Sequence, residues 1–243
     1  MHREIHHWHS PRLDKNMEVA VYGHNGFALL MFPTAAADYL EYERFGVIEA
    51  MAPFIDAGKV KIFSINSINN ESWLNPRMHP RHKAIRHQQF NGYVSEEVVP
   101  FIHTHCRGHT SIITTGASFG ALHGANTLFR RPDLIDGCIA MSGCYDLKDY
   151  TDGYWDEDVY FNSPIDYLPN LNDAHQLDLL RAKKHIHFVS GQGNYEKPSS
   201  SEDIGRILAS KGIPHEIDLW GADVNHDWPW WRKMLPHYLG GKF

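Results

Sequence analysis

The sequence of 243 residues lacks any apolar run close to the ~20 residues that a membrane-spanning helix requires. The opening stretch, Met1 to Trp8, has no apolar core of signal-peptide length either. Cysteine is scarce: Cys106, Cys138 and Cys144 lack Cys-x-x-Cys spacing and stand in or beside apolar segments. We therefore expect a cytoplasmic protein without a membrane span, whose cysteines are reduced and structural.

Runs of basic residues are absent as well. The chain has 23 Lys and Arg against 29 Asp and Glu, which gives a formal net charge of −6. A chain of this balance is not expected to bind nucleic acid or an anionic membrane surface. Internal repeats are also missing, and the length fits one domain, so we expect a single domain over residues 1–243. A homo-oligomer is compatible with the sequence, which leaves the oligomeric state open.

Histidine, by contrast, is abundant, with 18 residues, and a metal site has to be considered. The densest groups are His-His-Trp-His at 6–9 and His-Thr-His-Cys at 103–106. The second group could begin a zinc site, and a metal hydrolase that uses His103 and His105 is one alternative. No Asp, Glu or His set with ligand spacing follows either group. We therefore predict no metal and no cofactor.

From residue 27 onwards, β-prone apolar runs alternate with segments of helical periodicity. The runs lie at 27–32, 60–65, directly before Gly116, and at 134–141, 185–190 and 215–220, and the helical segments at 42–55, 82–103, 119–129, 199–212 and after 228. Such alternation predicts an α/β fold, with a mostly parallel sheet covered by helices on both faces and its chemistry at the carboxyl ends of the strands.

Two local patterns add detail to this prediction. An additional β-prone run at 17–22 is separated from 27–32 by Gly-His-Asn-Gly, and Asn-Gly in this place is typical of a hairpin turn. Ser199 to Glu202 fits a capping box, which predicts the start of the helix that ends near Gly212.

The central motif is Gly-Ala-Ser-Phe-Gly at residues 116–120, which follows an apolar strand and opens directly into a helix. This strand, turn and helix are the context that the nucleophile elbow of a hydrolase requires. Glycine at both flanking positions lets the turn pack closely while Ser118 holds a strained backbone. The sequence therefore predicts Ser118 as nucleophile, with the N–H of Phe119 at the helix start as an oxyanion donor.

A serine nucleophile needs a base and a carboxylate, each on a loop after a late strand. His226 follows the last predicted strand and is the predicted base. Glu196 follows the strand at 185–190, after two glycines that let the loop bend, and is the favoured acid. Asp146, after the preceding strand, is the alternative.

Residues 145–184 interrupt the alternation with aromatic side chains among acidic ones, and the segment is too long for a tight connection. We interpret it as a cap-like insertion that shapes the substrate pocket and that favours neutral, short or aromatic esters. Tyr154 and Trp155 are its predicted substrate contacts, and Trp73 marks the alternative position of the pocket.

The chain resembles the esterase family of α/β-hydrolases that groups esterase D-type enzymes with bacterial mycolyltransferases. The resemblance runs from about residue 17 to the C-terminus. The matching pieces are Gly116 to Gly120, Asn162-Ser163-Pro164, Gly191-Gln192-Gly193 before Glu196, and Asn225-His226-Asp227-Trp228. The resemblance implies the α/β-hydrolase fold and supports Glu196 as the acid. Where relatives have a glycine-rich turn that supplies the second oxyanion donor, this chain has Pro33-Thr34-Ala35.

Proline has no N–H, so the second donor has to be Thr34 or Ala35, and we favour Ala35. The sequence as a whole predicts a serine hydrolase that cleaves small-molecule carboxylic esters through an acyl-enzyme. The alternatives are an acyltransferase with the same triad and a non-catalytic binding protein of the same fold.

Overall fold

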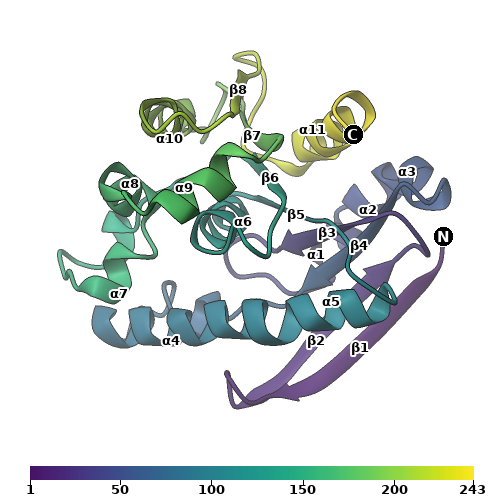
Figure 1. Ribbon diagram of the computed structural model, residues 1–243, viewed down its shortest axis with the longest axis horizontal. Helices are drawn as coiled ribbons and strands as arrows, with labels where there is room; N and C mark the ends of the chain where they lie inside the picture. Colours follow the sequence, from purple (N-terminus) through teal and green to yellow (C-terminus); the bar gives the residue numbers. More distant parts are fainter.

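The computed structural model describes residues 1–243, and all eight strands form one sheet with the order β1-β2-β4-β3-β5-β6-β7-β8 (Figure 1). Strands β3 to β8 are parallel to one another, whereas β2 is antiparallel to both β1 and β4. The strands are β1 (Arg3–Ser10), β2 (Lys15–Tyr22), β3 (Phe27–Phe32), β4 (Val60–Ile65), β5 (Ile112–Ala117), β6 (Gly137–Met141), β7 (His185–Ser190) and β8 (Glu216–Leu219). The mostly parallel sheet predicted from the sequence is confirmed.

Helices cover both faces of this sheet. They are α1 (Glu41–Arg44), α2 (Val47–Ala50), α3 (Ala52–Asp56), α4 (Pro80–Tyr93), α5 (Val99–His105), α6 (Phe119–Arg130), α7 (Glu157–Tyr160), α8 (Pro164–Tyr167), α9 (Ala174–Arg181), α10 (Pro198–Ser210) and α11 (Trp228–Gly241). Helices α1 to α3 and α11 pack on one face, and α4 to α6, α9 and α10 on the other.

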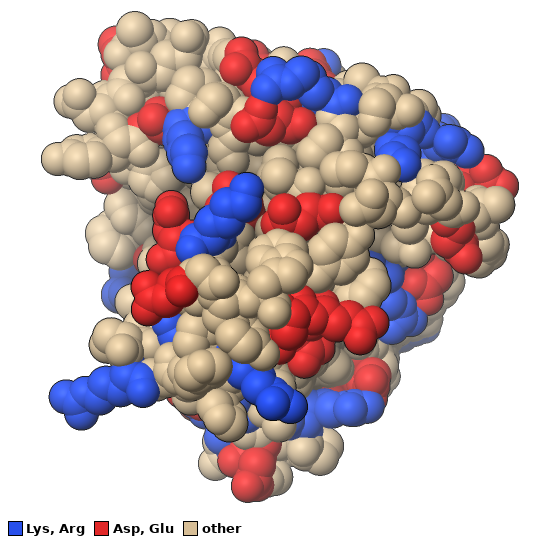
Figure 2. Space-filling view, turned by 90° about the vertical axis from the view of Figure 1, so that its left-hand side faces the viewer, with Lys and Arg blue, Asp and Glu red and all other residues tan.

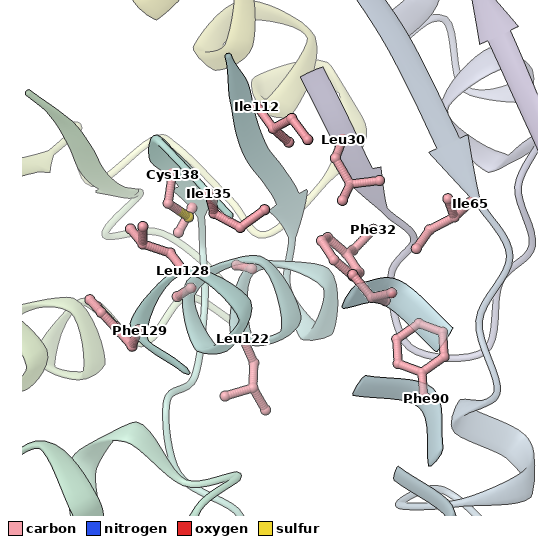
Figure 3. Close-up of a cluster of buried hydrophobic side chains, with 14 of the residues drawn as sticks. Leu30, Phe32, Ile65, Phe90, Ile112, Leu122, Leu128, Phe129, Ile135 and Cys138 are labelled. Carbon is pink, nitrogen blue, oxygen red and sulfur yellow. The ribbon is translucent and has the colours of Figure 1, made fainter. Parts of the chain in front are cut away.

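The strands supply a hydrophobic core to each face because successive side chains of a strand point to opposite sides. In β3, Leu30 and Phe32 join the larger core of 40 residues, while Leu29 and Met31 join the smaller core of 22. Figure 3 shows Leu30 and Phe32 on the larger core's side, facing α6. Strands buried on both faces read as continuous apolar runs, which is why the sequence located them.

The predicted hairpin between residues 17–22 and 27–32 is wrong. Strand β4 lies between β2 and β3, and residues Val19 to Tyr22 pair with β4 instead. The hairpin of this region is β1 with β2, whose register runs from Arg3 opposite Tyr22 to Ser10 opposite Lys15. The turn residues set only the local chain reversal, whereas burial of β2 against β4 decides the pairing.

Several helix predictions change in detail. The helical segment at 42–55 is three short helices, interrupted where Gly46 adopts φ +74° and where Pro53 follows Ala52. The segment at 82–103 is α4 and α5 joined by a π-helical turn, Val94–Val98, and Pro100 is the second residue of α5. Helix α10 begins at Pro198 without a side-chain cap, so the predicted capping box does not form. Proline fits the first helical turn, where its missing N–H costs no hydrogen bond.

Residues 145–184 fold into short helices, α7, α8 and α9, with 3₁₀ turns at Lys148–Tyr150 and Leu168–Asn170. A further 3₁₀ turn, Asn69–Glu71, precedes α4. On the side of the molecule that carries α7 and α8, acidic and basic side chains are interspersed, without a continuous basic stripe (Figure 2). None of the helices combines the length and apolar character that crossing a bilayer requires.

Gly26 is expected to be essential for the close contact between the β2–β3 connection and β4. It has φ +105°, and a Cβ there would lie 2.2 Å from the backbone carbon of Lys59. Gly26→Ala should therefore lower the free energy of unfolding by more than the about 1 kcal/mol that a left-handed conformation costs alone. Gly153→Ala is the control, because Gly153 has φ +76° and open space around it. Equal losses in urea denaturation would contradict this account of Gly26.

Candidate active site

Ser118 stands at the junction between β5 and α6. Its φ of 56° and ψ of −119° are strained for a residue with a side chain. Two hydrogen bonds hold the turn: Ser118 N–H donates to the carbonyl of Met141 at 2.9 Å, and Ala117 N–H donates to the Tyr42 hydroxyl at 2.8 Å. The strain is therefore maintained by neighbouring elements rather than relieved.

The two glycines of the motif permit backbone contacts that no side chain would allow. A Cβ on Gly116 would lie 2.4 Å from the backbone carbon of Gly120, and a Cβ on Gly120 would lie 2.3 Å from the carbonyl oxygen of Phe32. Helix α6 is thus pressed against β5 and the end of β3. Phe119 is the first residue of α6, where a backbone N–H has no acceptor within the helix.

His226 lies on the loop between β8 and α11, and its Nδ1 is 3.5 Å from a carboxylate oxygen of Glu196. That nitrogen is buried and forms no hydrogen bond, so the carboxylate is the polar group that it faces. The ring packs edge-on against Trp231 at a centroid distance of 5.1 Å. Asp227 accepts from the N–H of Trp228 and caps α11, which fixes the loop that carries His226.

The side chain of Glu196 is fully buried and is held by two serines as well as by His226. Ser142 donates to one carboxylate oxygen at 2.6 Å and Ser190 to the other at 3.0 Å. Trp231 Nε1 donates in turn to Ser142 Oγ at 3.0 Å. Burial raises the pKa of Glu196, but the close contact with His226 and the hydrogen bonds from the two serines outweigh it, so the net shift of the pKa is downward.

Asp146 has no part in this cluster. Its carboxylate accepts a hydrogen bond from the backbone N–H of Lys148, two residues away, and no histidine bonds to it. It is adjacent to the fully buried Tyr145, in the loop that follows β6. Of the two acids considered from the sequence, only Glu196 faces His226.

The loop after β3 is held from two sides. Glu41 accepts hydrogen bonds from the N–H of Thr34 at 2.8 Å and from its hydroxyl at 2.6 Å. Asn69 Nδ2 donates to the carbonyl of Ala35 at 2.7 Å. The N–H of Thr34 is therefore occupied, whereas that of Ala35 has no acceptor within the chain.

Two buried histidines support Asn69. His123 Nε2 lies 2.8 Å from Asn69 Oδ1, and its ring stacks on His87 at a centroid distance of 4.8 Å. Burial lowers the pKa of His123 to about 3, so the ring is neutral and its Nε2–H donates to the amide oxygen. Phe119 packs edge-on against His123 at 4.9 Å, which links this group to the start of α6.

A cleft of about 190 Å³ opens above these residues. Its walls comprise Ser118, Phe119, Ser142, Gly143, Cys144, Asp149, Tyr150, Tyr195, Lys197 and His226. The structure thus brings Ser118, Phe119 and His226 to one cavity, with Glu196 buried behind His226. Reasoning from the sequence expected the aromatic segment that contains Tyr150 to shape the pocket but did not single out Tyr150, and it missed Tyr195, which directly precedes Glu196.

The three substrate contacts expected from the sequence lie outside this cleft. Tyr154 and Trp155 line a separate shallow depression. The Tyr154 ring packs on His79, at the start of α4, at a centroid distance of 5.2 Å, so the insertion directs these aromatics toward α4. Trp73 is only 1% exposed and packs on His87 in the larger core.

His103 and His105 do not line the cleft either, and their side chains bond to different residues. His103 Nδ1 accepts from the N–H of Thr110, whereas His105 Nε2 faces Glu4. The metal-hydrolase alternative therefore has no ligand pair beside Ser118.

No family model and no curated protein sequence matches this chain, but solved structures match it over nearly its whole length. A ferulic acid esterase matches with a TM-score of 0.75 and 15% identity, over 98% of this chain and 96% of its own. S-formylglutathione hydrolase (FrmB) from Staphylococcus aureus matches with a TM-score of 0.69 and 15% identity, over 99% and 98%. MPT51 (FbpC1) from Mycobacterium tuberculosis matches with a TM-score of 0.70 and 15% identity, over 99% and 97%.

These structural neighbours include proteins named as an esterase and as a hydrolase. Similarity at 15% identity over whole chains establishes a common fold. The chain therefore has the α/β-hydrolase fold, as the sequence predicted.

The buried carboxylate of Glu196 should make stability depend on pH. Because the folded-state pKa lies below the ordinary value of 4.5, its stabilising contribution is complete above pH 4.5 and is lost as pH falls through the lower, folded pKa. Glu196→Gln should lower the free energy of unfolding by about 1–3 kcal/mol at pH 7, and the difference from wild type should shrink below pH 4.5. Urea denaturation across pH, with Asp146→Asn as the background control, checks this. A difference that grows on acidification would contradict the assignment.

Proposed function

We propose that this protein is a serine hydrolase that cleaves small-molecule carboxylic esters through an acyl-enzyme intermediate. The observation that carries the proposal is the strained Ser118, which shares one cleft with His226 while a buried Glu196 stands behind the histidine. A serine in this backbone conformation, stabilised by its surroundings, is characteristic of a nucleophile elbow. The esterase and hydrolase among the structural neighbours support the same reaction class.

In the proposed mechanism, Ser118 Oγ attacks the ester carbonyl carbon while His226 Nε2 takes its proton. Glu196 acts on the other ring nitrogen: a carboxylate beside Nδ1 selects the tautomer with hydrogen on Nδ1 and stabilises the imidazolium. The 3.5 Å separation shortens when that positive charge forms, as catalytic hydrogen bonds do in reacting complexes. His226 then protonates the leaving alcohol, and water attacks the acyl-enzyme by the same route in reverse.

The oxyanion of each tetrahedral intermediate is assigned to the N–H groups of Phe119 and Ala35. The first is at the start of α6, where the helix dipole also favours negative charge. The second is preferred to Thr34 because the Thr34 N–H is already bonded to Glu41. Glu41 and Asn69 would then hold the donor loop in place before substrate arrives, so little reorganisation is needed.

The substrate pocket is assigned to the cleft that Tyr150 and Tyr195 line, within a single domain whose insertion at 145–184 acts as a partial cap. The cleft is small, at about 190 Å³, and carries one Lys and one Asp. It therefore suits short or aromatic esters better than long acyl chains. Acyl transfer to an alcohol would use the same residues and differs only in the acceptor.

Ser118→Ala should abolish both ester hydrolysis and covalent labelling by a fluorophosphonate probe, because its hydroxyl supplies the acyl-enzyme bond. Turnover of a p-nitrophenyl ester should fall by on the order of 10⁶-fold. Mass spectrometry of the labelled wild type should place the probe on Ser118, and circular dichroism should show the variant folded. A wild type that neither labels nor turns over would favour the binding-protein alternative. An added alcohol that captures the acyl group would favour transfer.

Cleft aromatics, rather than those directed toward α4, should determine ester selectivity. Tyr150→Ala and Tyr195→Ala should change kcat/KM for small and bulky esters by different factors, since pocket contacts discriminate by about 1–3 kcal/mol per group. Trp155→Ala, in the same insertion but outside the cleft, is the matched control and should leave the ratio unchanged. If only Trp155→Ala changed the ratio of kcat/KM between small and bulky esters, the substrate pocket would instead lie in the α7 region.

A further inference from the structure

Toward the amino ends of the parallel strands, away from the candidate active site, three histidines converge on the carboxylate of Glu4. His6 Nε2 is 2.6 Å and His105 Nε2 is 3.0 Å from the same oxygen, Glu4 Oε2. His2 Nε2 contacts the other oxygen, Oε1. The ligand atoms of Glu4, His6 and His105 all lie within 4.8 Å of one another.

The fold assembles this cluster from residues that are remote in sequence. Strand alternation puts His2, Glu4 and His6 on one side of β1, where Glu4 and His6 are half-buried while their neighbours are exposed. His105 is the last residue of α5, and Figure 1 shows α5 passing beside the β1 and β2 edge of the sheet. The rings of His6 and His105 meet edge to face at a centroid distance of 5.1 Å.

The cluster is held firmly on one side and open to solvent on the other. Phe101 and Phe63 pack against the two inner histidines, His6 and His105 respectively, at centroid distances of 5.1 and 5.6 Å. Side-chain exposure is 15% for His105 and 33% for His6. A hollow of about 650 Å³, which Glu4 and His105 line, connects the cluster to the surface.

We propose that Glu4, His6 and His105 form a zinc-binding site, with His2 or water as the fourth ligand. Two or three imidazole nitrogens with one carboxylate oxygen make a donor set that Zn²⁺ accepts. Ligand atoms about 2.0–2.1 Å from a tetrahedral ion are about 3.4 Å apart. The observed nitrogen-to-oxygen separations are below that value and would have to open by less than about 1 Å, a side-chain adjustment.

The position of the cluster indicates a structural role rather than a catalytic one. Residue Arg3 pairs with Tyr22, which pairs with Ile62 near the start of β4, so Glu4 lies toward the amino ends of the parallel strands. The candidate active site is at their carboxyl ends. A zinc ion bound here would cross-link the edge strand β1 to α5, and it would stabilise the folded chain by mass action.

Zinc binding can be measured on the full, untagged chain after removal of bound metal with EDTA. Isothermal titration with ZnCl₂ should give one site per chain, and zinc should raise the Tm. His6→Ala and Glu4→Gln should each weaken binding by more than about tenfold and reduce the Tm shift. His7→Ala is the matched control: it removes a histidine from the same cluster in sequence, but His7 is exposed on the other side of β1.

Because the readouts are affinity and Tm, the result is independent of the proposed hydrolase activity. Absence of zinc binding by the wild type would overturn the site. So would equal binding by wild type, His6→Ala and Glu4→Gln, or a loss confined to His7→Ala. The paired Glu4→Gln variant keeps the size of the side chain, so a folding defect in one variant does not leave the question open.

Discussion

Three backbones meet beside Ser118 more closely than side chains would allow, and the rest of the candidate site depends on this approach. Gly116 and Gly120 lie where a Cβ would be within 2.4 Å of neighbouring backbone atoms. Because α6 can then begin directly against β5 and β3, the strained Ser118 projects from the carboxyl end of the central strand β5, and the first N–H groups of α6 lie beside it. A wider junction would relax the serine and move the helix start away from it.

Around this junction, buried polar groups that form hydrogen bonds hold the loops of the cleft in place. Glu196 is fully enclosed, yet Ser142, Ser190 and His226 supply enough favourable interactions to lower its pKa in spite of burial. Asn69 plays a comparable part for the loop after β3, supported by the neutral His123. The Glu196 and Asn69 networks connect the loops of the cleft to the cores behind them. The sheet and α6 therefore restrict the movement of these loops.

The parts of the fold that could be predicted from the sequence are those with local causes. The strand, turn and helix around Ser118 follow from an apolar run, two glycines and a helical segment, all within about twenty residues. The pairing of β2 is different: Asn25-Gly26 is a good turn sequence, but β4, nearly forty residues later, inserts between β2 and β3. The direction of Tyr154 also depends on a distant contact, with His79 at the start of α4.

By itself, the sequence determined the α/β class, the nucleophile motif and the loops on which a base and an acid could stand, because periodicity and glycine placement act over short distances. Only the tertiary structure decided that Glu196 rather than Asp146 faces His226, and that the cleft is lined by Tyr150 and Tyr195. Only the tertiary structure brings His6, from the cluster at 6–9, and His105, from the cluster at 103–106, to Glu4. The physical reason is common to all three: side chains about 30 to 100 residues apart become neighbours only when burial of the sheet fixes which strands and helices lie side by side.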